Sequence, residues 1–331
     1  MASHSLHDTV KLIKKGVDTY ITNRAMVVSY EVTLSCNCNC RHCDLGGFIE
    51  DETQIGPEEY ADLTRSLKPL VAQISGGEPL LRKDIAAIVK AIKQSAGVPH
   101  VILVTNGVLL NESNYLQLRE AGVNQFSVSL DFPDERHDEF RRRPGLYKRL
   151  EQTLPRLANL GFRDIVLNTA ITRANLRDIL PLVGKATEWN VSISFSAYTA
   201  LRTNEVGYCI SDGEDLEILR QSISELIAMK KQGASVVNSD VVLRNTAKFF
   251  ERGYMPNCRA GTRFLIIIPN GRLVPCSLHR SEYSSRKEMM KDFSRTNRCG
   301  GCYVAIRSYS ELSLLSHLKS GPLYISQTAP R

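Results

Sequence analysis

The sequence lacks any apolar run long enough to cross a bilayer, because a transmembrane helix needs about 20 consecutive apolar residues and every apolar stretch here is interrupted sooner. The N-terminal residues 1–8 also lack the apolar core of a secretory signal peptide. Without an export signal, the nine cysteines are not expected to form disulfides. We therefore expect a cytoplasmic protein whose thiols bind metal rather than each other.

A strong charge imbalance is also missing. The chain has 42 basic and 35 acidic residues among 331, a net charge of +7, and the two signs alternate along most of the expected helices. Its only tight basic run is 141–143, and it has no aromatic-rich, glycine-punctuated RNA-binding motif. We therefore expect no nucleic-acid partner. The hydrophobic fraction of 43% is enough for one large core or two modest ones.

What the sequence does have is four cysteines within eight residues. Cys36, Cys40 and Cys43 have the spacing C-x3-C-x2-C, with Cys38 between them. The loop follows the β-branched run 26–34, a predicted strand, so its thiols lie where open α/β sheets bind ligands. Three thiolates can hold three corners of an iron–sulfur cube and leave one iron open. The alternatives are a disulfide and a zinc site, although zinc usually takes paired cysteines and four ligands.

This loop, with the aromatic ring of His42 before its last cysteine, resembles the signature of the radical S-adenosylmethionine (SAM) enzymes. The resemblance implies a 4Fe–4S cluster on Cys36, Cys40 and Cys43 whose open iron binds SAM. Reductive cleavage of SAM would give a 5′-deoxyadenosyl radical that abstracts a substrate hydrogen. An electron donor of the flavodoxin or ferredoxin type is implied as well. By the family motif Cys38 is not a ligand, and we expect it to point away from the cluster.

Strands and helices alternate from the cysteine loop to residue 197. Strands are expected at 26–34, 70–75, 101–105, 125–130, 164–171 and 191–197, and helices from 57 and at 82–94, 111–121, 146–160 and 175–189. Such an order predicts an α/β fold with a parallel sheet. The resemblance implies a partial (β/α)6 TIM-like barrel, followed by a small α+β C-terminal cluster domain.

A second motif, Gly-Gly-Glu-Pro from residue 76, directly follows the second expected strand. Its glycines let the backbone approach a ligand closely, and in the family this stretch contacts the SAM ammonium group. Asn106 and Asp131 are expected to face the same cavity, although Asn and Asp are also ordinary strand-end residues. The SAM-binding residues that the resemblance implies are His42, Gly76, Gly77, Glu78, Ser129, Asn168 and Phe195.

Four more cysteines lie near the C-terminus. A β-hairpin is predicted over 266–274, with Asn270-Gly271 at its turn. This region resembles the Twitch domain, the short form of the SPASM extension, and the resemblance implies a second, auxiliary 4Fe–4S cluster with no open iron. Structural zinc is the alternative. The implied ligands are Cys258, Cys276, Cys299 and Cys302.

We predict four segments: an N-terminal amphipathic helix in 1–24, a radical SAM core in 25–200, a helical linker in 201–256, and the Twitch-like domain with a C-terminal tail in 257–331. The first helix either packs on the core or touches a membrane or a lipid. His137 and His279 are candidate acid–base groups, but the pattern around neither supports the role. We identify no catalytic residue.

The resemblance thus implies a radical SAM, oxidoreductase-like enzyme. We expect a net oxidation or rearrangement of a small metabolite, because relatives with one auxiliary cluster include alcohol dehydrogenases. A lipid or isoprenoid and a ribosomally made peptide are alternative substrates. A zinc-bound scaffold without catalysis is the alternative of a different class.

Overall fold

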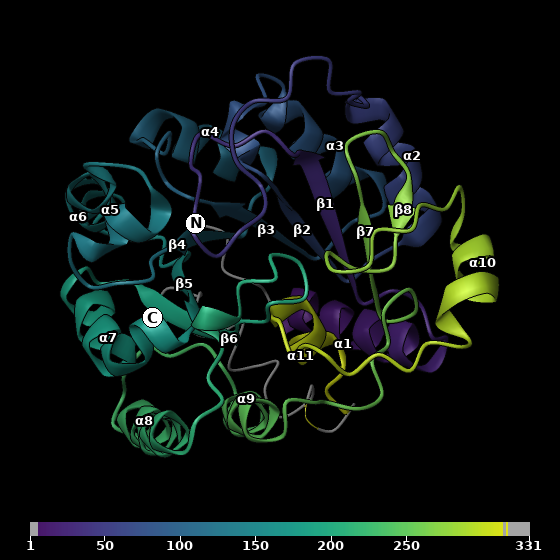
Figure 1. Ribbon diagram of the computed structural model, residues 1–331. Coiled ribbons are helices and arrows are strands. Elements are labelled where there is room, and N and C mark those ends of the chain that lie inside the picture. The colour runs from purple at the N-terminus through teal and green to yellow at the C-terminus, as the bar shows by residue number, and fades with distance from the viewer. Residues whose placement is uncertain (1–5, 314–315, 317–331) are drawn as a thin grey trace.

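A computed structural model describes residues 6–313 and residue 316. In this part of the chain one sheet runs in the order β6-β5-β4-β3-β2-β1-β7-β8, with helices packed around it (Figure 1). Strands β1 to β6 follow in chain order and each neighbouring pair is parallel, which confirms the partial (β/α)6 barrel. The strands are β1 (Val27–Thr33), β2 (Val71–Gly76), β3 (His100–Thr105), β4 (Gln125–Ser129), β5 (Ile165–Ile171), β6 (Ser192–Ala197), β7 (Phe264–Ile267) and β8 (Leu273–Val274).

The expected helices form with small shifts at their ends, and a short one that the pattern did not predict, α5, precedes α6. The helix expected at 82–94 begins three residues later, at Ile85, and a separate 3-10 turn, η1 (Pro79–Leu81), precedes it. The α-helices are α1 (Leu6–Ile21), α2 (Pro57–Leu67), α3 (Ile85–Ser95), α4 (Glu112–Ala121), α5 (Arg136–Arg141), α6 (Leu146–Ala158), α7 (Ile179–Glu188), α8 (Gly213–Lys231), α9 (Asp240–Arg252), α10 (Arg286–Met289) and α11 (Ala305–Ser310).

The predicted C-terminal hairpin forms, with β7 and β8 antiparallel. The pattern did not indicate that β7 also pairs in parallel with β1, along residues 27–30 of the first strand. Figure 1 shows the two strands side by side, although about 240 residues separate them in the chain. The C-terminal cysteine segment is therefore joined to the barrel through a continuous sheet. The segment boundaries given above stay predictions.

The two faces of the sheet differ sharply. On the outer face, the Tyr30 hydroxyl bonds Thr64 of α2, and the neighbouring apolar side chains are fully buried. Strand alternation and register place on the inner face the polar residues Ser29, Glu31, Gln73, Ser75, Ser127, Ser129, Asn168, Ser194 and Ser196. Several of them are only partly buried. Closed TIM barrels fill this space with bulky branched side chains, so here the inner face remains accessible to a polar ligand.

Helix α1 is attached to the core near its C-terminal end. Lys15 donates hydrogen bonds to the carbonyls of Ala96 and Gly97 beyond α3, and the guanidinium of Arg263 lies 4.0 Å from the centre of the Tyr20 ring. Residues 1–5, where the predicted helix begins, and the tail from 317 lie outside the described residues. Among the helices that are described, none is long and apolar enough to span a membrane.

Candidate active site

The first cysteine loop follows the end of β1, and its thiols are buried at Cys36, Cys38 and Cys40 and partly buried at Cys43. Each predicted ligand sulfur accepts a hydrogen bond. The amide of residue 38 and the side-chain amide of Asn106 lie 3.5 and 3.7 Å from the Cys36 sulfur, and the Leu45 amide lies 3.4 Å from that of Cys43. The Cys40 sulfur lies 3.7 Å from a guanidinium nitrogen of Arg141. Such donors stabilise the charge of a thiolate ligand, so this donor set fits an iron–sulfur cluster.

Cys38 does not point away from its neighbours, and that expectation was wrong. Its thiol shares hydrogen bonds with those of Cys36 and Cys40, and the residue is only 3% exposed. The loop turns so tightly that thiols two residues apart face one another. That Cys38 is not a ligand stays a prediction.

The glycine pair Gly76-Gly77 at the end of β2 supports the base of this loop. The amide of Gly77 donates to the Thr33 carbonyl at 2.7 Å, and the next amide donates to the Ser35 carbonyl at 2.9 Å. A Cβ on Gly76 or on Gly77 would lie 2.1 Å from one of these carbonyl oxygens. Only glycine lets the two backbones come this close. The close approach predicted for the motif therefore includes the strand that carries the cysteines.

Glu78 joins the ends of β2 and β3. Its carboxylate accepts hydrogen bonds from the Leu80 amide, the Thr105 hydroxyl and the Asn106 amide at 2.8 to 3.1 Å. Burial raises the pKa of this carboxyl to about 7. The side chain of Asn106 also contacts the Cys36 sulfur. Glu78 therefore helps to position the first cysteine loop by holding Asn106.

Three side chains form a row across the inner face. Ser129 is in register with Asn168, and Asn168 with Ser194. Phe195 follows Ser194 and therefore projects to the other face, where it belongs to the buried core and its backbone bonds Asn238. The structure thus brings Ser129 and Asn168 together and leaves the Phe195 ring apart from them.

Helix α5, which the pattern did not predict, packs on the cysteine loop. The ring of Phe140 stacks on the ring of His42, with centroids 4.7 Å apart. The backbone carbonyl of Phe140 also accepts a hydrogen bond from the Arg41 amide at 2.9 Å. Asp131 was expected to face the SAM cavity but pairs instead with Arg141, at 2.6 Å. Arg141 belongs to the basic run 141–143, and nothing in the sequence distinguishes it from its two neighbours.

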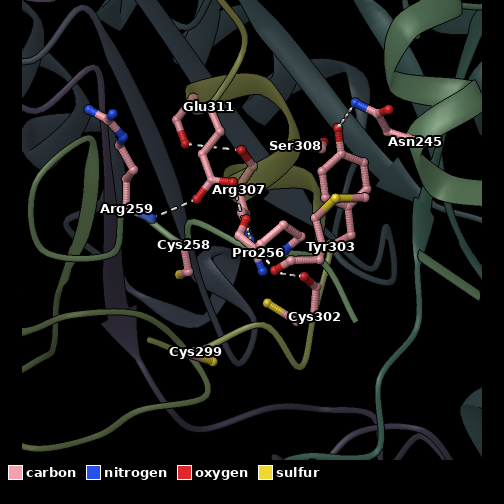
Figure 2. Close-up of polar contacts among 12 residues, drawn as sticks. Asn245, Pro256, Cys258, Arg259, Cys299, Cys302, Tyr303, Arg307, Ser308 and Glu311 are labelled. Carbon is pink, nitrogen blue, oxygen red and sulfur yellow. Dashed lines mark hydrogen bonds and ion pairs between the residues drawn. The ribbon is translucent and has the colours of Figure 1, made fainter. Parts of the chain in front are cut away.

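Figure 2 shows Cys258, Cys299 and Cys302 close to one another at the C-terminal site. The Cys276 thiol is close enough to Cys258 and Cys302 to interact with them electrostatically. Its sulfur accepts a hydrogen bond from the amide of residue 279 at 3.2 Å. All four predicted ligands therefore lie in one neighbourhood. Within the described ranges, no three His, Cys, Asp or Glu side chains are grouped as a single metal ion would need; the cysteines of a four-iron cube each bind a different iron.

One buried arginine organises this site (Figure 2). Arg307 donates to the carbonyls of Met255, Pro256 and Cys302 at 2.5 to 2.8 Å and pairs with Glu311 at 2.9 Å. It thereby holds the segment before Cys258 against the segment that contains Cys302. Sequence reasoning missed this residue, because its role depends on two segments that meet only in the fold.

The glycines between the last two cysteines are needed for packing. A Cβ on Gly300 would lie 1.8 Å from the ring of Tyr254, and one on Gly301 would lie 2.9 Å from Leu201. Two segments distant in sequence therefore cover the C-x2-C turn.

The comparisons with known proteins agree with this geometry. Residues 30–183 match the family described as the Radical SAM superfamily. The protein therefore contains a radical SAM domain, and the resemblance noted from the first cysteine loop is confirmed for this part of the chain.

Two relatives and one solved structure illustrate the range of similar proteins. The chain is 35% identical over 168 residues to an AdoMet-dependent heme synthase of Methanosarcina barkeri, which is 48% of this chain and 46%, about half, of that protein. It is 25% identical over 283 residues to a probable GTP 3′,8-cyclase of Methanothermobacter marburgensis, covering 81% of this chain and 90% of that protein. The structure of Streptococcus suis SuiB bound to precursor peptide SuiA superposes with a TM-score of 0.62 at 18% identity, over 94% of this chain and 69% of SuiB.

Proposed function

We propose that this protein is a radical SAM enzyme that oxidises or rearranges a small polar metabolite. The observation that carries the proposal is the site itself. Three cysteines at the end of β1 each accept a hydrogen bond at sulfur, above a polar inner face in a radical SAM domain. When bound, a 4Fe–4S cluster and SAM would supply one-electron reduction and a carbon radical. An electron donor of the flavodoxin or ferredoxin type would deliver the electron.

The residues of the chain position and protect these groups. Cys36, Cys40 and Cys43 would hold the cluster, and the glycine pair at the end of β2 fixes the base of their loop. Ser129 and Asn168 present a hydroxyl and an amide side by side on the inner face, where they can bind the polar groups of SAM. Packing of α5 over the loop helps to keep Cys36 and Cys40 buried and so limits access of water and oxygen.

The inner face favours a polar substrate. Its hydroxyls and amides, with the Glu31 carboxylate held by Arg280 at 2.7 Å, offer hydrogen bonds over several strands. A lipid chain placed there would leave these groups without partners, which costs about 1–3 kcal/mol for each buried group. The similarity to a probable GTP 3′,8-cyclase, whose name states a polar substrate, also supports this class.

For the C-terminal cysteines we propose a Twitch-like auxiliary 4Fe–4S cluster on Cys258, Cys276, Cys299 and Cys302. Four thiols in one neighbourhood, held by Arg307, support it. With all four ligands supplied by the protein, such a cluster would accept an electron from a substrate radical or support the fold. The first role favours a net oxidation.

The ligand choice can be tested by alanine substitution and anaerobic reconstitution. Replacement of Cys36, Cys40 or Cys43 should abolish 5′-deoxyadenosine formation, because each removes one of three cluster ligands. Cys38→Ala is the matched control, since it removes a thiol from the same loop, and it should retain activity. An equal loss at Cys38 would overturn the ligand assignment.

The auxiliary site is tested separately by counting metal. Ala at Cys276 or Cys302 should remove about half of the iron while SAM-dependent spectral changes persist. Full retention of iron would reject the auxiliary cluster. Zinc without iron or sulfide in the unmodified protein would instead support a structural scaffold.

The substrate class needs its own assay. A panel of polar metabolites, isoprenoids and peptides would be screened for stimulated 5′-deoxyadenosine release. We expect stimulation by a polar compound. Stimulation by isoprenoids alone would contradict the proposed class.

A further inference from the structure

The contact between Arg141 and Cys40 goes beyond ligand assignment. The Arg141 side chain is buried, with its Nε 2.6 Å from the Asp131 carboxylate and an Nη nitrogen 3.7 Å from the Cys40 sulfur. Arg142 and Arg143, its neighbours in sequence, are exposed. One cation of the basic run is therefore removed from water and placed against a predicted cluster ligand.

Several contacts fix the guanidinium at this place. The preceding residue, Phe140, holds the loop through its ring on His42 and its carbonyl on the Arg41 amide. On the other side, the Asp131 amide donates to Nδ1 of His137 at 3.1 Å, and its carbonyl accepts from Asn175 at 3.0 Å. Both partners of the ion pair thus have little freedom to rotate away from the thiol.

The two members of the Arg141–Asp131 ion pair lie differently relative to the Cys40 sulfur. Arg141 donates a hydrogen bond to the Cys40 sulfur, whereas Asp131 acts on this thiol through its charge alone. One oxygen of the Asp131 carboxylate is buried without a hydrogen-bond partner among the described residues. Buried charges normally have their polar atoms satisfied. A carboxylate oxygen without a partner, beside a guanidinium directed at sulfur, is an exception to this rule.

We infer that Arg141 is a positioning residue that raises the reduction potential of the cluster held by Cys36, Cys40 and Cys43, with Asp131 limiting the effect. This inference rests on the proposed function. Adding an electron makes the cluster more negative. A fixed positive charge beside a ligand sulfur stabilises that reduced state, and net charge and hydrogen bonds at sulfur are known determinants of cluster potential.

The two members of the pair should shift the potential in opposite directions. Arg141→Met removes the cation, so reduction becomes harder. Asp131→Asn removes the carboxylate charge and leaves the cation, so reduction becomes easier. A purely structural role would reduce cluster loading in both variants without such opposite shifts.

The test is a redox titration of the full chain, reconstituted anaerobically and followed by electron paramagnetic resonance. The signal of this cluster is recognised by its change on adding SAM. At a fixed solution potential, Arg141→Met should lower the ratio of reduced to oxidised cluster at least tenfold. This corresponds to a reduction potential lower by about 59 mV for a one-electron couple. Asp131→Asn should raise it, and Arg141→Lys should lie between Arg141→Met and the unmodified protein.

Arg143→Met is the matched control, because it removes an exposed charge two residues away, and it should titrate as the unmodified protein does. Equal potentials in the unmodified protein and Arg141→Met, or shifts of the same sign in Arg141→Met and Asp131→Asn, would overturn the inference. If Arg141→Met fails to fold, an unchanged or lowered ratio in Asp131→Asn overturns it alone. Absence of any SAM-responsive cluster in the unmodified protein would instead reject the proposed function.

Discussion

At the scale of single residues, the site depends on close backbone contacts that admit only one residue type. Gly77 is the clearest case, because a Cβ there would meet two carbonyl oxygens, at 2.1 and 2.6 Å. Backbone atoms cannot rotate aside as a side chain can. The cysteine loop and the end of β2 therefore have to be considered together.

Gly77→Ala should destabilise the protein by about 1–3 kcal/mol, as overpacking in a close-packed region does, and should lower the iron bound by the first loop. Gly184→Ala is a suitable control, because that position lies within α7 and has no atom within 4 Å of the added Cβ. Denaturant unfolding and iron analysis would measure both. A Gly77→Ala protein as stable as the control would show that the loop can move without cost.

The raised pKa of the buried Glu78 carboxyl predicts that the stability of the protein depends on pH. Burial raises its folded pKa to about 7, above its unfolded value. The protonated carboxyl therefore contributes stability that is complete below about pH 4.3 and is lost as the pH rises through about 7. Relative to Glu78→Gln, the unmodified apoprotein should lose roughly 4 kcal/mol of stability over this range, since one pKa unit corresponds to about 1.4 kcal/mol. Urea unfolding at several pH values would measure the difference, and a constant difference would contradict the raised pKa.

At the scale of elements, two short helices determine how the cysteines are held. Helix α5 supplies Phe140 and Arg141 to the first loop, and α11 supplies Arg307 to the C-terminal site. Both have six residues and little intrinsic stability of their own. They are held by tertiary contacts, which is why periodicity did not reveal them.

Arg307→Met should leave Glu311 partly buried without its cation and remove three hydrogen bonds to backbone carbonyls. Loss of one partner of a buried ion pair typically costs about 3–5 kcal/mol. We expect lower stability and loss of the auxiliary iron, with SAM-dependent spectral changes retained. Arg298→Met, an exposed arginine in the same segment, is the control. Unchanged iron in Arg307→Met would show that the C-terminal site forms without this support.

At the scale of the whole molecule, β7 connects the two cysteine sites. It covers the edge of β1, the strand that leads into the first cysteine loop. The Arg280–Glu31 ion pair adds a second link, from the segment after Cys276 to the inner face of β1. Loss of the C-terminal part would thus affect the barrel directly.

Residues 1–256 expressed alone should aggregate, because removing β7 leaves unpaired backbone groups along residues 27–30 of a hydrophobic strand. Soluble yield and light scattering, compared with the full chain, would measure this. A soluble, monomeric fragment would show that the barrel does not need its seventh strand.

The sequence by itself determined the features that depend on local spacing. These are the order of the six strands from 27 to 197 and of the longer helices between them, the C-x3-C-x2-C loop at the end of the first strand, and the C-terminal hairpin. Periodicity, turn residues and cysteine spacing act over a few residues, so they can be recognised without the fold. The direction of Cys38, the pairing of β7 with β1 and the burial of Arg141 and Arg307 were decided only by tertiary structure. Each depends on segments distant in the chain, which come into contact only when the chain folds into the partial barrel.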